Sequence, residues 1–366
     1  MDSRKNGNLA KLVAFFLIVT VLVMAIAFSA SGWQGDDSVK PDSGNAPTGG
    51  EADENTDGND TQTNTEPTAP AYTHYISGLG IDESESLLAP LCILYDTEAP
   101  MYGISSAFLT VELPIEGGKT RLLAFTNKAT NIGKIGALAP TRKYISNVAL
   151  YFGGIPVFIG DDDSFPYSSV FSDSTVIDLN TSAGYYYTEY GTYRYTNADL
   201  LSSYIKNNSI STVMSSAPQM PYVFTDSINT ARGTIKANTA LIQFDKGSTS
   251  ELIYSASDAK YKLQKNSSAL SDRHDDSELN YDNVFILFSD AATYETSDST
   301  ELILDTVSGG HGYYLNGGLA KRIVWSTTES GELQFKDEEG KTLEILPGSS
   351  YMAFAKSSYA PYTKLA

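Results

Sequence analysis

Cysteine, histidine and basic residues are scarce in this 366-residue chain, which has one cysteine, three histidines and 25 Lys plus Arg against 44 Asp plus Glu. A single cysteine excludes an intrachain disulfide and a cysteine-rich zinc site, and three histidines leave little for a histidine-based metal centre. The net charge of −19 disfavours nucleic-acid binding, because phosphate contacts need a basic surface. We therefore expect no metal, no cofactor and no nucleic-acid partner.

One long hydrophobic run is present near the N-terminus. Residues 12–33 contain no charged side chain over 22 positions, and a helix needs about 20 residues to cross the hydrocarbon core. Basic residues precede the run and Asp36 and Asp37 follow it, so residues 1–11 are predicted to be cytoplasmic and the rest of the chain extracellular. A single transmembrane anchor is the preferred interpretation. The alternative is a cleaved signal peptide, for which Ala25-Ile26-Ala27 offers an A-x-A pattern inside the run.

Residues 34–71 are predicted to be a disordered acidic linker. They contain nine acidic residues and one lysine, with few aliphatic side chains and no aromatic one. Such a segment cannot bury enough apolar surface to offset the entropy lost on ordering. The simplest interpretation is a spacer between the membrane and a folded region, and an acidic interaction tail is the alternative.

Large apolar residues return from residue 72 onward, and residues 72–225 predict an α/β or α+β domain. Strand-like runs alternate with helical patterns, which is typical of that class. The segment 107–127 reads as a hairpin that turns at 116–119. Helices are predicted from Pro140 to about residue 152, and over 198–208 with Asn197 as the cap.

Residues 226–366 predict a β-rich domain. Strand-like segments follow one another with little helical pattern, at 240–245, 251–256, 283–291, 301–307, 313–325 (with an Asn-Gly-Gly turn), 333–346 (a hairpin) and 350–355. The predicted fold class is thus a transmembrane helix, an α/β or α+β domain and a β-rich domain.

Four charged residues form the best candidate polar cluster: Glu112, Glu116, Arg121 and Arg142. Two carboxylates can act as acid and base if their environments separate their pKa values, and nearby arginines can bind a charged or sugar-like ligand. An ion-pair network that fixes the hairpin to the following helix is the structural alternative. The common hydrolase, P-loop and zincin signatures are absent from the sequence.

Other polar and aromatic segments carry weaker signals. Six tyrosines occur within 185–195, and Tyr186 and Tyr193 are candidates for an aromatic surface that contacts carbohydrate or protein. A strand with tyrosines on both faces is the alternative. Asp161-Asp162-Asp163 is either a calcium-binding loop or an ordinary acidic turn. His274 and His311 are expected in exposed loops, the latter in a glycine-rich turn.

The segment 99–125 resembles the YerB family, also called DUF3048, whose members are extracytoplasmic and membrane-tethered. Its pattern P-x-x-G-x-x-x-A-D-I-V-Y-E-x-x-V-E-G-G-I-T-R-F is matched by Pro100, Gly103, Ala107, Glu112, Glu116, Gly117, Gly118, Thr120 and Arg121. The family run I-G-P-V-R-S-A-R-P-Y resembles 135–144, with Arg142 at the second arginine, and Y-T-x-A-D-L-L resembles 195–201. In the second half, similar positions are Tyr261, Asp272, Asn283, Gly310, Gly312, Asn316, Trp325, Gly340 and Gly348.

The resemblance implies two family domains, and it makes Asp272 a further ligand-binding candidate. Several polar positions of the family are replaced in this divergent member, by Ala139, Phe158, Thr192, Leu263 and Leu270. The glycine and apolar positions are better preserved, which favours a shared fold over a shared chemistry.

These observations predict a membrane-anchored extracytoplasmic protein whose two-domain region binds a cell-envelope partner, a protein or a glycan, without catalysis. The alternative is an envelope-acting hydrolase or transferase that uses Glu112 and Glu116. No reaction is established by the sequence, and the non-enzymatic interpretation is preferred.

Overall fold

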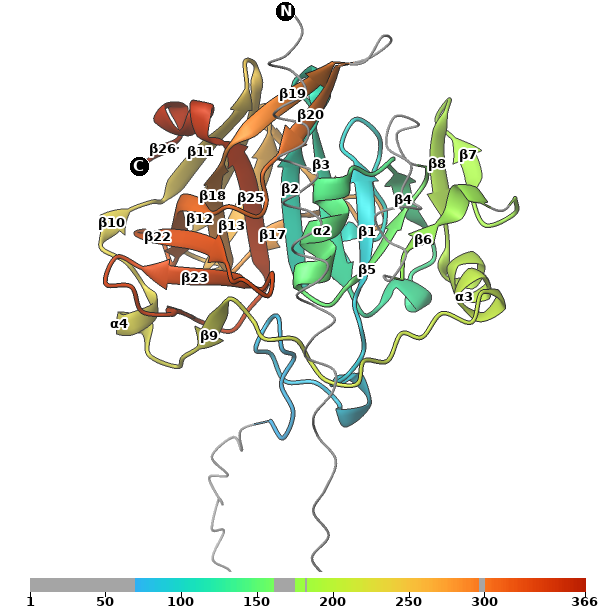
Figure 1. Cartoon of the computed structure of the whole chain (residues 1–366), viewed down its shortest axis with the longest axis horizontal. Coiled ribbons are helices and arrows are strands. Elements are labelled where there is room, and N and C mark those ends of the chain that lie inside the picture. The colour runs from blue at the N-terminus through green and yellow to red at the C-terminus, as the bar shows by residue number, and fades with distance from the viewer. Residues whose placement is uncertain (1–69, 161–174, 182, 296–299) are drawn as a thin grey trace, which may run out of the picture. The chain divides into compact units, whose positions relative to one another are not determined.

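A computed structural model describes residues 70–160, 175–181, 183–295 and 300–366. The described chain is rich in β-strands and has few helices (Figure 1). Its centre is a 14-stranded sheet in which eleven strands follow the order β10-β22-β21-β18-β25-β2-β3-β1-β4-β8-β7. Strands from both halves of the chain therefore belong to one sheet.

The N-terminal half supplies the β7 end of this sheet. Its strands are β1 (Leu91–Asp96), β2 (Leu109–Pro114), β3 (Thr120–Thr126), β4 (Ile135–Leu138), β5 (Ile155–Phe158), β6 (Ile177–Asp178), β7 (Tyr187–Glu189) and β8 (Tyr193–Thr196). The predicted hairpin is confirmed, because β2 and β3 pair antiparallel around a 3-10 turn at Glu116–Gly118. The helices α2 (Lys143–Tyr151) and α3 (Ala198–Asn207) confirm the two predicted helices. Asn197 caps α3 by accepting from the Leu200 amide at 2.9 Å.

The C-terminal half supplies the other end. Its strands in the large sheet are β10 (Ile235–Lys236), β18 (Asn283–Ser289), β21 (Gly310–Asn316), β22 (Leu319–Thr327), β23 (Leu333–Asp337) and β25 (Ser350–Lys356). β25 lies between β18 and β2 and is parallel to both. β18 is buried along its whole length, as expected for a strand with both faces covered.

Each face of the large sheet has its own cover. A second, six-stranded sheet packs on one face, where Ile242 and Leu263 share a core with Ile93 and Leu122. Its strands are β11 (Thr239–Asp245), β12 (Ser248–Ser255), β13 (Lys260–Lys265), β14 (Ser268–Ala269), β17 (Asn280–Tyr281) and β26 (Lys364–Leu365). On the other face, α2 packs through Ile145 and Val148.

Besides several 3-10 turns, the remaining short elements are the helix α4 (Ile228–Ala231) and three strand pairs. The pairs are β15 (Ser271–Asp272) with β16 (Ser277–Glu278), β19 (Ala291–Glu295) with β20 (Thr300–Leu304), and β24 (Leu343–Ile345) with β9 (Tyr222–Phe224). The predicted hairpin over 333–346 is therefore wrong in its second strand. Lys336 and Thr342 form an isolated bridge, but β24 hydrogen-bonds in parallel with β9 instead of continuing along β23.

The predicted anchor at 12–33 and the linker at 34–71 fall almost entirely outside the described residues, as does the acidic loop at 161–163. Within the ranges that the structure does describe, no helix has the length and apolarity needed to span a bilayer.

Candidate functional site

Glu112 lies at the centre of a buried polar network that joins the two halves of the chain. Its carboxylate is fully buried on β2 and accepts hydrogen bonds from the hydroxyls of Thr120 at 2.6 Å and Ser250 at 2.8 Å. The Tyr351 hydroxyl and the Lys265 ammonium also donate to it. Four donors thus occupy the carboxylate, which has about four acceptor sites: two lie on β3 and β25 beside β2, and two lie on β12 and β13 of the six-stranded sheet.

The electrostatics of this network favour an ionised Glu112. Burial by itself raises the pKa of Glu112, but the charge of Lys265 and the hydrogen bonds from its donors outweigh burial and hold the pKa below its ordinary value. Burial and the neighbouring carboxylate raise the pKa of Tyr351 well above its ordinary value. A general acid or base needs a pKa near the working pH and access to substrate, and Glu112 has neither.

The other three members of the predicted cluster lie apart from Glu112. β2 and β3 pair Leu113 with Arg121, so Arg121 points to the opposite face of the sheet from Glu112. Arg121 pairs with Asp96 at 3.0 Å. Glu116 pairs with Arg142, the residue before α2, and so connects the hairpin turn to that helix. The structure thus resolves the four residues into separate ion pairs.

Asp272 is buried and bound by protein donors. Its carboxylate accepts from the amides of Gly103 at 3.1 Å, Ser105 at 2.9 Å and His274 at 3.0 Å, and from the Ser105 hydroxyl at 2.8 Å. It therefore fixes the 3-10 turn at Ile104–Ser106 of the N-terminal half to the C-terminal half. With four donors in place, it has little capacity left for a ligand.

The tyrosine-rich segment forms β7 and β8 and the turn between them. The guanidinium carbon of Arg194 lies 5.6 Å from the centre of the Tyr186 ring. Tyr193 packs beside the buried Tyr195. Both candidates are only half-buried. The tyrosines thus point to more than one side of the hairpin, and some of their surface is used inside the molecule.

Lys134 holds the end of this hairpin. Its ammonium lies 4.1 Å from the ring centre of Tyr102, 4.9 Å from that of Tyr190 and 4.3 Å from that of Tyr195, and it pairs with Glu189. The hydroxyls of Tyr102 and Tyr190 are 2.7 Å apart. A cation enclosed by aromatic rings is attracted by their negative faces. The chain's own lysine therefore fills this aromatic cage.

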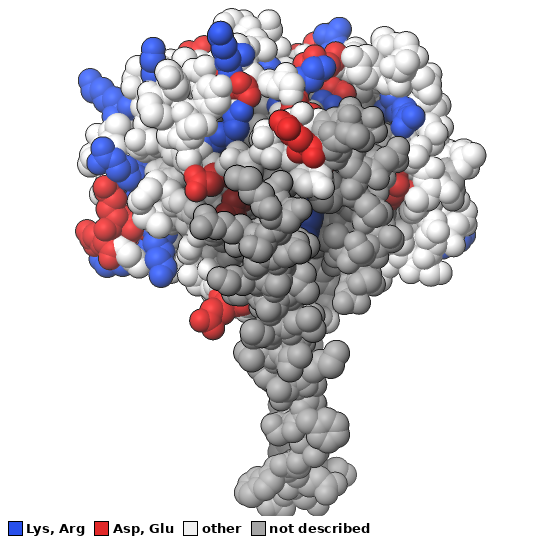
Figure 2. Space-filling model, turned by 45° about the horizontal axis from the view of Figure 1, so that its top comes forward, with Lys and Arg blue, Asp and Glu red and all other residues white. Residues whose placement is uncertain are grey.

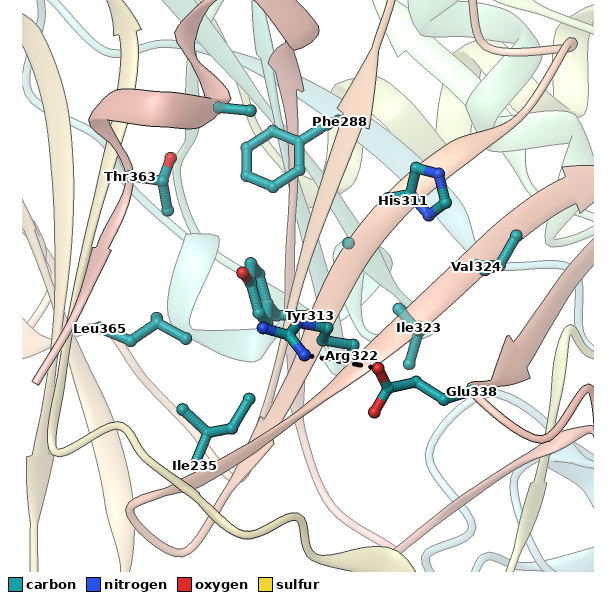
Figure 3. A pocket seen from close by; sticks show the side chains of 12 residues that line it. Ile235, Phe288, His311, Tyr313, Arg322, Ile323, Val324, Glu338, Thr363 and Leu365 are labelled. Atoms are coloured by element: carbon teal, nitrogen blue, oxygen red, sulfur yellow. Dashed lines mark ion pairs between the residues drawn. The ribbon is translucent and has the colours of Figure 1, made fainter.

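A pocket of about 690 Å³ opens between the large sheet and the C-terminal segment (Figure 3). Its apolar lining comprises Ile235, Phe288, Ile323, Val324 and Leu365. The polar lining includes His311 and Tyr313 on β21, Arg322 on β22, and Glu338 beyond β23. The register pairs Tyr313 with Arg322 and His311 with Val324. The side chains of these two pairs therefore project from the same face of the sheet.

The charged groups of this pocket remain accessible. Arg322 and Glu338 are 3.5 Å apart at closest approach, and their side chains are 62% and 65% exposed. A hydrogen bond with Tyr313 and the charge of Glu338 raise the pKa of Arg322 above its ordinary value. An exposed ion pair of this kind contributes little to folding, so its polar atoms are available to a ligand.

Sequence reasoning missed this pocket because the expected glycine-rich turn at His311 is wrong. His311 lies in the strand β21 and not in a turn. The expectation that its side chain is exposed is confirmed. A Cβ atom at Gly312 would lie 2.2 Å from the Ile286 carbonyl oxygen, and one at Gly310 would lie 2.2 Å from that of Phe288. The glycines thus allow β18 to approach β21 closely. Close approach of a neighbouring backbone is a common reason for glycine within a strand.

Metal ligands do not gather within the described ranges, where no group of three His, Cys, Asp or Glu side chains could hold an ion. His274 is exposed, as expected, and its Nε2 lies 2.9 Å from the Lys134 carbonyl oxygen, to which a ring N–H donates. His74 is buried against Phe108, with 4.0 Å between ring centres.

Comparisons with known proteins agree with this architecture. The model described as "Protein of unknown function (DUF3048) N-terminal domain" matches residues 78–216, and that of the DUF3048 C-terminal domain matches residues 240–352. The crystal structure of the YerB protein from Bacillus subtilis superimposes with a TM-score of 0.66 at 17% sequence identity. That match covers 77% of this chain and 96% of the YerB chain. At this sequence identity it shows a shared fold and nothing about function. No curated protein matches the chain.

Proposed function

The chain belongs to the DUF3048 family, and we propose that it is a membrane-anchored extracytoplasmic protein whose two-domain region binds a cell-envelope partner without catalysing a reaction. In this proposal residues 12–33 span the cell membrane once, residues 1–11 are cytoplasmic and residues 34–71 are the spacer. The uncharged 22-residue run and the basic residues before it support the anchor. The partner is a protein or a glycan of the envelope.

The observation that carries the binding function is the contrast between the pocket at β21 and β22 and the predicted acid–base groups. Glu112 and Asp272 are each occupied by protein donors, and Glu116 pairs with Arg142. The pocket instead presents accessible polar atoms above an apolar floor, which is the usual composition of a ligand site.

Surface charge fits a partner other than nucleic acid. Lys and Arg side chains lie among Asp and Glu side chains on the face seen in Figure 2, instead of forming a basic stripe. A nucleic-acid site needs clustered positive charge. Together with the net charge of −19, this distribution gives no support to a nucleic-acid partner.

Co-sedimentation of the detergent-solubilised full-length protein with bacterial cell-envelope material tests the proposal. We expect the protein to be retained by the envelope pellet, and the supernatant to gain no soluble fragments by mass spectrometry. Absence of retention would contradict a binding function. Fragments that are released by the wild type and lost in Glu116→Gln would favour the hydrolase or transferase alternative.

A further inference from the structure

We infer that the pocket at β21 and β22 binds uncharged sugar units of an envelope glycan, an inference that rests on the proposed binding function. The pocket is large enough, because its volume of about 690 Å³ falls within the usual range of roughly 300–1,000 Å³ for small-ligand sites. It is also bounded on one side by the chain's last residues, so it is a pocket between elements and not a flat surface.

Aromatic side chains give the pocket an apolar platform. The rings of Phe288 and Tyr313 lie 6.3 Å apart between centres and meet edge to face. Both rings border the open space in Figure 3, together with the aliphatic side chains of Val324 and Leu365. A sugar ring has an apolar C–H face that packs on such a surface, while its hydroxyls remain at the edge. Tyr313, the more exposed of the two rings, therefore offers the stacking face to an amphipathic ligand, and the buried Phe288 supports it edge-on.

The polar groups select hydroxyls over ions. Arginine offers only donors and an ionised glutamate offers only acceptors, and Arg322 and Glu338 present both kinds side by side. Each hydroxyl of a sugar can donate and accept, so neighbouring hydroxyls match this pair.

Charge balance points to an uncharged ligand. The formal charges of Arg322 and Glu338 cancel within the pocket. An anionic ligand would gain from Arg322 and lose from Glu338, which lie side by side. A cationic ligand would meet the opposite arrangement within the pocket. Neutral glycan is therefore the occupant that the charges favour.

Calorimetric titration of the full-length protein in detergent tests this inference with three probes. Chitotetraose and cellotetraose are neutral, and a poly(glycerol phosphate) oligomer is anionic. We expect a neutral probe to bind. We expect Tyr313→Ala to weaken that binding at least tenfold and Arg322→Lys to weaken it about fivefold, because lysine keeps the charge and loses the planar donors. Tyr294→Ala on β19 is the matched control and should bind as the wild type does.

The Glu338→Gln variant separates charge from hydrogen bonding. It should keep neutral-probe affinity within about twofold, since the amide still accepts a hydrogen bond, and it should improve binding of the anionic probe. Thermal unfolding of every variant checks that the fold is intact.

Retention of the wild type and of Tyr313→Ala to equal extents on envelope material would overturn the pocket inference and leave the proposed binding function standing. Binding of the anionic probe alone, or displacement from envelope material by protease treatment of its proteins, would overturn the neutral-glycan assignment. Loss of all retention would overturn both proposals.

Discussion

Replacing Lys265 by methionine should strongly destabilise the protein. Glu112 is fully buried, and Lys265 is the cation that offsets its charge, with only 11% of its side chain exposed. Removing one partner of a buried ion pair costs about 3–5 kcal/mol, because the other charge stays buried and uncompensated. Three hydroxyl donors to Glu112 remain in Lys265→Met, so we expect about 3 kcal/mol, the lower end of that range.

Urea unfolding of the full-length protein in detergent, followed by far-ultraviolet circular dichroism, measures this change. Lys262→Met is the matched control on the same strand, since Lys262 is 42% exposed and its pairs with Glu278 and Asp258 are solvated. We expect no measurable change for the control. The double variant Glu112→Gln/Lys265→Met should recover part of the loss. If Lys265→Met unfolds at the same urea concentration as Lys262→Met, the network does not stabilise the junction as described.

Acid should weaken the fold through His74, because burial lowers its pKa to about 4 and the unfolded chain therefore binds the proton more tightly. Stability should fall by up to about 3 kcal/mol as pH drops from about 6.5 to about 4, and His74→Phe should remove that slope from urea midpoints measured across the range. Asp272→Ala should cost about 2–3 kcal/mol in the same assay, because buried amides lose their acceptor, whereas the exposed Asp276→Asn, which suits the left-handed backbone at that position, should leave the midpoint unchanged. Lys134→Met should increase proteolytic cleavage in the β7–β8 hairpin relative to Lys128→Met, and equal cleavage in both would contradict the role given to the aromatic cage.

Local patterns in the sequence were sufficient for the local elements. The apolar spacing of 140–152 and the cap at Asn197 identified α2 and α3, and the glycines after Glu116 identified the β2–β3 turn. These features depend on hydrogen bonds and packing between residues close in sequence, which propensity and periodicity report directly.

Long-range pairing could not be obtained in this way. β25 lies between β2 and β18, although the amino-acid composition of β25 does not indicate which strands it pairs with. The same limit explains the site: Lys265 and Tyr351, which neutralise and bind Glu112, come from the other half of the chain. The pocket also depends on strand register, which brings Tyr313 beside Arg322. The glycines at 310 and 312 are the available signal, but glycine in this pattern predicts a turn as readily as close approach of two strands.

Hydrogen–deuterium exchange of the full-length protein, with and without envelope material, tests the proposed binding site most directly. Binding at the pocket predicts slower amide exchange in peptides that cover β21, β22 and residues 359–366, with little change elsewhere. Unchanged exchange in those peptides, or protection confined to the β7–β8 hairpin, would contradict the account.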